Sequence, residues 1–498
     1  MNYNSTRSNN FTCTSAQAIK QGLAPDGGLF VPECFPGFSI DEICGFSALT
    51  YQERAVKILS RFLTDYTPGE IEDCVNKAYN KESFATESIT PVYKLNSGTY
   101  FLELWHGVTC AFKDIALQIL PHFLTKAQKK TGDDRTAVIL VATSGDTGKA
   151  ALEGFADVEG TKIAVFYPRD GVSDIQKLQM TTQSGNNVAV SGIHGNFDDA
   201  QSGVKKIFTD KEFIAELDRR GYVLSSANSI NWGRLVPQIV YYFSAYADML
   251  KAGEIEKGEK INFVVPTGNF GDILAGYYAK LLGLPVNKLV CASNKNNVLT
   301  DFIKTGEYNK NRDFYTTHSP SMDILISSNL ERFIYNMSGN DSAATKAYMD
   351  ALARDGKYAV SPEIKEKMQK ILWGGCCDDA ETAEAIKETY EKYGYVMDTH
   401  TAVGKNVCDK YLKETGDKTK TVVLSTASPF KFNGAVISAI KGDDAVKNKT
   451  EFELLDMLAD ISGLVIPKGL AQLKNKEVRF PGYIEKDDMK NFVSEFNK

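Results

Sequence analysis

Apolar runs alternate with segments of helical periodicity over most of this 498-residue chain. Such alternation is typical of βαβ units, in which helices cover parallel strands. One series contains AVILVAT at 137–143 and KIAVFYP at 162–168, and a second contains KINFVVPTG at 260–268 and KLVCASN at 288–294. A late run, TVVLSTA at 421–427, rejoins the second series. We therefore expect an α/β fold of two lobes with parallel or mixed sheets, which face each other across a cleft.

The composition of the chain changes toward both ends. Near the start, GLAPDGGLFVPE at 22–33 crowds glycines and prolines around short apolar pieces, and the tail after 441 is rich in Lys and Asp. We predict an N-terminal module, a two-lobed core and a C-terminal extension. Their boundaries are 1–95 for the module, 96–440 for the core, about 137–230 for the smaller lobe within it, and 441–498 for the extension.

Composition indicates a soluble globular protein. The net charge of −6 comes from intermixed acidic and basic residues, so the chain lacks a basic footprint for nucleic acid. No apolar run approaches the ~20 residues that span a bilayer, and the polar start lacks the apolar core of a signal peptide. The 9 cysteines include no C-x-x-C and the 5 histidines no i, i+4 pair. We expect reduced thiols, no metal site, no membrane or nucleic-acid partner, and a cytoplasmic location.

Lys113, in the segment HGVTCAFKD at 106–114, is the first candidate for chemistry. It opens a helical segment that Pro121 is expected to kink. The positive end of the helix dipole and partial burial beside Phe112 would both lower the pKa of its amine, as a Schiff-base nucleophile requires. The alternative is an ordinary solvated lysine in a first helical turn.

The segment GNFG at 268–271 lies between a predicted strand and a predicted helix. Glycine flexibility and the helix N-terminus make it a candidate anion site suited to a phosphate monoester. It is neither a P-loop nor a dinucleotide fingerprint. Asp272, the next residue, is expected to cap the helix with its carboxylate turned away. A reactive amine and a phosphate cradle in one chain together indicate pyridoxal phosphate, with Lys113 as its partner.

Three further segments supply polar candidates. TSGDTG at 143–148 offers the hydroxyls of Ser144 and Thr147 to a carboxylate or a second phosphate, although an ordinary βα turn is the alternative. Thr426, after a buried-type strand, can offer a hydroxyl to a ring nitrogen. Arg234, in NSINWGRL, has a planar guanidinium that suits a substrate phosphate. The alternative is that it forms an exposed ion pair with a purely structural role.

These motifs together resemble the threonine synthase family, a group of fold type II pyridoxal-phosphate enzymes with tryptophan synthase β-like architecture. The resemblance implies that Lys113 forms the Schiff base with the cofactor and that Thr426 meets its pyridine nitrogen. It also implies a cradle for the cofactor phosphate at Gly268, Asn269, Phe270 and Gly271. The segments that carry it, in the family's order, are YNSTR, GLAPDGGLFVPE, HGVTCAFKD, ATSGDTG, NSINWGRL, PTGNFGD and STASPFKF.

The resemblance also implies an activity. The family's carbon–oxygen lyase reaction converts O-phospho-L-homoserine and water into L-threonine and phosphate, the last step of threonine biosynthesis. Lys113 would act as the general acid and base. Ser144 and Thr147 are assigned to the substrate carboxylate or phosphate, and Arg234 to its phosphate. The expected assembly is a monomer or a homodimer.

The chain departs from the family pattern at three positions. Ser428 stands where the family often has His, and Val108 where it often has Pro. Asp146 stands where related enzymes have Asn near the ring hydroxyl, so the partner of that oxygen is open. Two alternatives stay open as well: another fold type II lyase, such as a threonine or serine dehydratase or a cysteine synthase, and a catalytically silent homologue that binds phosphorylated ligands.

Overall fold

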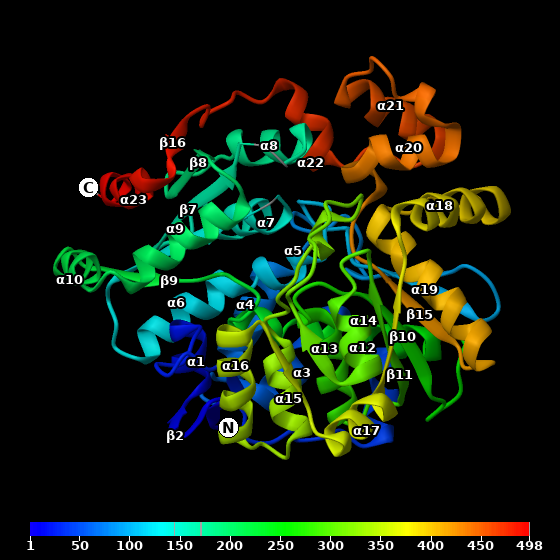
Figure 1. The fold of residues 1–498 in the computed structure, drawn as a ribbon, viewed down its shortest axis with the longest axis horizontal. Coiled ribbons are helices and arrows are strands. Elements are labelled where there is room, and N and C mark those ends of the chain that lie inside the picture. Colours follow the sequence, from blue (N-terminus) through cyan, green and yellow to red (C-terminus); the bar gives the residue numbers. More distant parts are fainter. Residues whose placement is uncertain (144, 170–171, 498) are drawn as a thin grey trace.

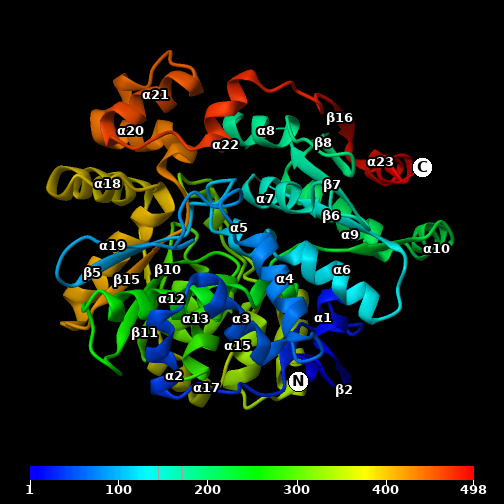
Figure 2. The same ribbon diagram turned by 180° about the vertical axis from the view of Figure 1, so that it is seen from behind.

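The computed structural model describes residues 1–143, 145–169 and 172–497. Two α/β lobes lie one above the other, with the N-terminal strands beside the larger lobe and the C-terminal helix beside the smaller one (Figures 1 and 2). The predicted fold class of two parallel or mixed-sheet lobes is confirmed. Within the described ranges, no helix has the length and apolar character needed to cross a bilayer.

The larger lobe contains a six-stranded sheet with the strand order β14-β11-β10-β15-β5-β4. Neighbouring strands are parallel except β4 and β5, which are antiparallel. Its central strands β10 and β15 are buried along their whole length, which explains their continuous apolar sequences. The strands are β4 (Val92–Lys94), β5 (Thr99–Glu103), β10 (Ile261–Pro266), β11 (Val286–Ser293), β14 (Leu372–Cys376) and β15 (Thr421–Ser425).

Helices cover both faces of this sheet. Alternate residues of β10 point to opposite sides, so Val265 joins the largest hydrophobic core while Val264 joins a second core with α19. Toward the first face lie α12 (Gln238–Lys251), α13 (Gly271–Leu281), α14 (Val298–Thr305) and α17 (Pro362–Ile371). Toward the second lie α18 (Asp379–Tyr393) and α19 (Thr399–Thr415).

The smaller lobe contains a five-stranded sheet with the order β16-β8-β7-β6-β9. The edge strand β16 comes from the C-terminal extension and pairs in parallel with β8. The sequence pattern did not indicate this strand. The strands are β6 (Thr136–Ala142), β7 (Thr161–Pro168), β8 (Val188–His194), β9 (Tyr222–Ser225) and β16 (Tyr483–Glu485). The helices are α7 (Asp146–Phe155), α8 (Asp174–Thr181), α9 (Phe197–Thr209), α10 (Lys211–Arg219) and α23 (Met489–Phe496).

The N-terminal residues form a small sheet and a set of helices that pack on the core. Trp232 lies 5.2 Å from Tyr3 and 5.5 Å from Phe62 between ring centroids, which joins this part to the interior. The strands are β1 (Tyr3–Ser5), β2 (Ser8–Cys13) and β3 (Phe30–Pro32). The helices are α1 (Ser15–Gln21), α2 (Ile40–Gly45), η1 (Phe46–Ala48), α3 (Tyr51–Phe62) and α4 (Pro68–Ala78).

The predicted break near Pro121 is present, because α5 (Lys113–Leu117) ends before α6 (Leu120–Lys130) begins. The segments between the lobes and beside the larger one are α11 (Trp232–Leu235), β12 (Glu307–Asn309), η2 (Pro320–Met322), α15 (Leu330–Met337), α16 (Ser342–Asp355) and β13 (Lys357–Ala359). The C-terminal part adds η3 (Pro429–Phe432), α20 (Asn433–Lys441), η4 (Asp443–Ala445), α21 (Glu451–Ser462), α22 (Lys468–Ala471), η5 (Gln472–Asn475) and η6 (Lys486–Asp488).

Candidate active site

Lys113 begins α5, at the end of a loop that follows β5. The loop is tied to the segment after β15, because the N–H of Phe112 donates to the carbonyl of Thr426 at 2.8 Å and Ala111 forms a β-bridge with Ala427. Strands β5 and β15 are parallel neighbours, so both segments leave the same edge of the sheet. This pairing places Thr426, itself buried, beside the lysine.

The loop before Lys113 is strained and closely packed. Cys110 has φ 62°, a left-handed conformation that is uncommon for residues other than glycine and that often accompanies functional sites. A Cβ atom at Gly107 would lie 2.4 Å from a carboxylate oxygen of Asp114, so only glycine fits there. Thr109 donates to that carboxylate through its N–H at 2.8 Å and its hydroxyl at 2.6 Å. The loop conformation is thus fixed on both sides of the lysine.

The amine of Lys113 is buried, and burial is the main cause that lowers its pKa. Asp146 Oδ2 lies 3.5 Å from Nζ and opposes this shift, whereas the positive charges of Lys431 and Arg234 reinforce it. The hydroxyl of Ser321 lies 3.4 Å from Nζ. The alternative of a solvated first-turn lysine is therefore wrong, and the lowered pKa favours the neutral form that a nucleophile needs.

Asp146 connects Lys113 with a second lysine. The Nζ of Lys431 lies 2.6 Å from Asp146 Oδ1, and the amide of Gln176 donates to the same oxygen at 2.9 Å. Burial opposes ionisation of Asp146, but the two lysines outweigh it and hold its pKa well below the usual range. The carboxylate is brought to Lys113 by close contact of α7 with α5, because Gly154 leaves no side chain between the helix and the carbonyl of Leu117.

The predicted phosphate cradle lies at the start of α13. Phe270 has φ 63° and is the left-handed N-cap residue, so the chain turns sharply before the helix begins at Gly271. The carbonyl of Asn269 accepts the N–H of Asn329 at 3.0 Å, and that of Gly268 accepts the Ser327 hydroxyl at 2.8 Å. These two hydrogen bonds hold the turn in place, and the first N–H groups of the helix, which have no partner within it, are available to an anion.

Ser321, in η2, links the lysine to the cradle and was not identified from sequence. Its hydroxyl contacts Lys113 and also donates to Asp146 at 3.3 Å, while its carbonyl would lie 2.8 Å from a Cβ at Gly268. The residue therefore stands where the lysine and the glycine turn approach each other. Neither helical nor strand periodicity marks this segment, so the sequence offered no signal.

Arg234, in α11, is buried and donates to the carbonyl of Ala227 at 2.8 Å. Burial alone lowers its pKa to about 10, with no acidic side chain of the described residues contributing. The expected alternative of exposed pairing is therefore wrong. Its positive charge also contributes to the lowered pKa of Lys113. A buried guanidinium without a carboxylate partner is suited to an anionic ligand.

The turn TSGDTG is organised by Thr143, whose hydroxyl accepts the N–H groups of Gly145 at 3.0 Å and Gly148 at 2.9 Å. Thr147 is half-buried in the first turn of α7, next to Asp146. Ser144 lies outside the described residues.

The expectation for Asp272 is only partly met in the structure. Asp272 does not cap α13, because the helix has no side-chain cap and the carboxylate accepts from Tyr241 at 2.6 Å and Tyr242 at 2.8 Å. It is turned away from the cradle as expected. His106 stacks on Trp105 and contacts Glu103 Oε2 at 2.7 Å.

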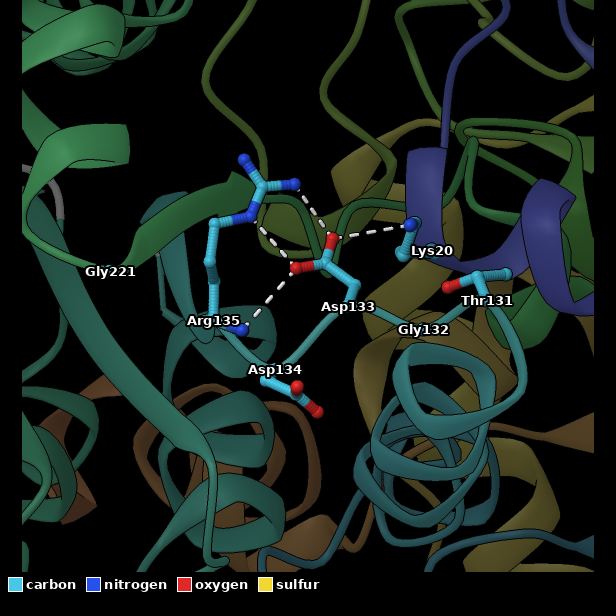
Figure 3. Close-up of a pocket in the computed structure, with 7 residues that line it drawn as sticks. All are labelled: Lys20, Thr131, Gly132, Asp133, Asp134, Arg135 and Gly221. Carbon is cyan, nitrogen blue, oxygen red and sulfur yellow. Dashed lines mark hydrogen bonds and ion pairs between the residues drawn. The ribbon is translucent and has the colours of Figure 1, made fainter.

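A charged surface depression lies apart from these residues (Figure 3). Asp133 forms ion pairs with the amine of Lys20 at 3.1 Å and with the guanidinium of Arg135 at 2.7 Å. The main charges of the depression therefore neutralise one another. No predicted site residue lines it, and it is open to solvent. Among the described residues, no three side chains of His, Cys, Asp or Glu converge in a way that would hold a metal ion.

The chemistry of these donors fits pyridoxal phosphate. Lys113, Lys431 and Arg234 are buried, and Asp146 pairs with both lysines, so the guanidinium of Arg234 keeps a charge that an anionic ligand would balance. The glycine turn supplies backbone donors for a phosphate, and Lys113 supplies an amine for an aldehyde.

Comparisons with known proteins agree with this arrangement. The chain matches the family models "Threonine synthase N terminus" at residues 2–79, "Pyridoxal-phosphate dependent enzyme" at 85–363 and "Threonine synthase, C-terminal" at 401–488. It is similar to threonine synthase of Pseudomonas aeruginosa, with 39% identity over 88% of this chain and 90% of that protein.

A human protein, threonine synthase-like 1, is 40% identical over 90% of this chain, which spans 61% of the length of that relative. The crystal structure of PLP-bound threonine synthase from Brucella melitensis superposes with a TM-score of 0.88, with 35% identity and 100% of both chains covered. The likeness thus extends from the first strands to the last helix.

Proposed function

Because this chain belongs to the threonine synthase family of pyridoxal-phosphate-dependent enzymes, we propose that it converts O-phospho-L-homoserine and water into L-threonine and inorganic phosphate. The observation that carries the proposal is the buried, pKa-lowered amine of Lys113, which shares one site with the glycine turn and with Arg234. One phosphate would occupy the turn, and a second would meet the guanidinium.

When bound, the cofactor supplies an electron-withdrawing ring that stabilises negative charge on substrate carbon. The chain's own residues then have distinct roles. Lys113 Nζ takes the proton from the substrate Cα and moves protons at Cβ. The N–H groups of 268–271 hold the cofactor phosphate, and the hydroxyl of Thr426 faces the ring nitrogen. Departure of the γ-phosphate from Cγ, with loss of a proton from Cβ, would leave these two carbons unsaturated; Cγ then gains a proton to become the methyl group, and water adds at Cβ.

Substrate-binding roles follow from position and chemistry. Arg234 presents a planar fork to the γ-phosphate, because it is buried and no acidic side chain within the described ranges pairs with it. Ser144 and Thr147, in the turn that precedes and opens α7, are assigned to the substrate carboxylate or phosphate. The hydroxyl of Ser321 lies 3.4 Å from Lys113 Nζ and the ring centroid of Phe112 lies 4.8 Å from it, so both side chains contact the amine.

The finer features of the protein are proposals as well. We infer a cytoplasmic location, supported by the fact that every cysteine is a free thiol, as a reducing compartment requires. We infer a monomer or a homodimer without nucleic-acid or membrane partners. We also keep the division into residues 1–95, 96–440 and 441–498, supported by the separate small sheet of β1 to β3.

The test is a visible spectrum of the purified full-length protein, followed by addition of O-phosphohomoserine with assays for phosphate and threonine. We expect a chromophore and equal amounts of both products. Lys113→Ala should abolish both, whereas Lys129→Ala, at an exposed position near the end of α6, should change neither. A chromophore without threonine would favour another lyase or a silent binder, and no chromophore after addition of pyridoxal phosphate would overturn the proposal.

A further inference from the structure

We propose that Lys431 is a positioning residue of this site, which keeps Asp146 ionised by a permanent ion pair and so leaves Lys113 free to react as a neutral amine. The inference rests on the proposed role of Lys113 as the reactive amine. It assigns a function to a second lysine that the family-based prediction left without one.

The geometry around Asp146 is asymmetric. Its Oδ1 atom lies 2.6 Å from the amine of Lys431, whereas Oδ2 lies 3.5 Å from that of Lys113. The Lys431 side chain is 0% exposed and that of Asp146 is 3% exposed, so solvent cannot replace either charge. Gln176 donates to Oδ1 and Ser321 to Oδ2. The shorter and more buried ion pair of Asp146 is therefore the one with Lys431, and not the one with Lys113.

Electrostatics explains why this asymmetry matters. A buried carboxylate needs a cation nearby, and without Lys431 the nearest one would be Lys113. Lys113 would then hold its proton and lose nucleophilicity. Lys431 also repels positive charge on Lys113 directly, which lowers the pKa of that amine. The ionisable groups that act on one or both lysines are Asp146 in α7, Asp114 in α5, Arg234 in α11, Asp272 in α13 and Cys110 in the preceding loop.

Lys431 also contacts the loop that carries the reactive lysine. Its amine donates to the carbonyl of Thr109 at 3.0 Å, and the N–H and hydroxyl of Thr109 bind Asp114. Replacement of Lys431 would therefore disturb both charge and loop position. A test has to separate these two effects, which a pH profile does, because a loose loop lowers reactivity at every pH, whereas a lost charge moves the midpoint.

The experiment uses the purified full-length chain, freed of bound cofactor and mixed with pyridoxal 5′-phosphate at a series of pH values between about 6 and 10. The adduct is reduced with borohydride, and its yield at Lys113 is measured by mass spectrometry of the peptide. For Lys431→Met we expect the pH of half-maximal yield to rise by about one unit or more. Lys431→Arg, which keeps the charge, should return the midpoint toward that of the wild type.

Lys149→Met is the matched control, because Lys149 is a buried lysine of the same helix as Asp146 that pairs instead with Glu153 at 2.6 Å. Its midpoint should equal that of the wild type. An unchanged midpoint in folded Lys431→Met, or a shift of the same size in Lys149→Met, would overturn the inference. If wild-type protein gives no adduct at Lys113, the proposed function itself fails, so the two failures are distinguishable.

Discussion

The Nε2 atom of His400 accepts the backbone N–H of Ser321 at 3.2 Å. The other ring nitrogen lies 2.7 Å from Asp398 Oδ2, which fixes the tautomer with its proton on Nδ1. Both His400 and Asp398 are buried. The pair therefore holds the segment that contacts Lys113 and closes over Gly268.

His400→Leu should loosen this segment, because the N–H of Ser321 loses its acceptor at a cost of about 1–3 kcal/mol. We expect faster amide hydrogen exchange in a peptide that covers 317–323 and weaker binding of pyridoxal phosphate. His400→Gln, whose side-chain oxygen can accept in place of Nε2, should restore part of both. Equal exchange in the Leu variant and the wild type would refute this role.

Gly268→Ala should weaken cofactor binding. The added Cβ would lie 2.8 Å from the carbonyl of Ser321, and backbone on both sides leaves little room to relax. Overpacking of this kind costs about 1–3 kcal/mol, so an absorbance titration with pyridoxal phosphate should give a dissociation constant raised roughly tenfold. Gly69→Ala, in α4 where no atom lies within 4 Å of the added Cβ, is the control and should bind normally.

Arg234→Lys should raise the KM for O-phosphohomoserine by roughly tenfold or more, with a smaller effect on kcat. A lysine keeps the charge but loses the planar fork, and hydrogen bonds to charged groups contribute about 1.5–3 kcal/mol. Steady-state kinetics and inhibition by inorganic phosphate would measure the change. Arg219→Lys, near the end of α10, should leave both unaltered; the assignment is wrong if Arg234→Lys behaves in the same way.

Much of the fold was predictable because parallel strands are continuous apolar runs. The sequence placed Gly268 and Thr426 after such runs, but it did not give the strand order, which depends on long-range pairing. In the structure β15 lies between β5 and β10, so the segments that follow all three strands meet at one edge. The resemblance to a family supplied what periodicity alone could not.

The remaining parts depend on contacts between distant segments. Ser321 and His400 lie 79 positions apart and come together through packing rather than through any local motif. The short strand β16 pairs with β8 of the smaller lobe, although the two strands lie far apart in the sequence. Asp272 has the position of a capping residue, yet two tyrosine hydroxyls of α12 bind it instead, so tertiary contacts override the local rule.

Asp272 should make stability depend on pH. Burial raises its pKa to about 6 from an ordinary value of 3.8, although Tyr241 and Tyr242 pull it lower. Between these pH values the folded state binds more protons than the unfolded state. The free energy of unfolding therefore falls as pH rises from about 4 to about 6, by about 3 kcal/mol in total, and stays lower above that range.

Asp272→Asn should remove this loss. Both tyrosine hydroxyls donate to Oδ1, which an asparagine retains, so the variant keeps its contacts but cannot ionise. We expect the stability of the variant relative to the wild type to increase from pH 4.5 to pH 7.5, as measured by urea unfolding of both proteins at both pH values. Asp114, whose pKa burial also raises to about 6, is present in both proteins and cancels from the difference. A difference between variant and wild type that does not change with pH would show that the Asp272 carboxylate ionises normally in the folded protein.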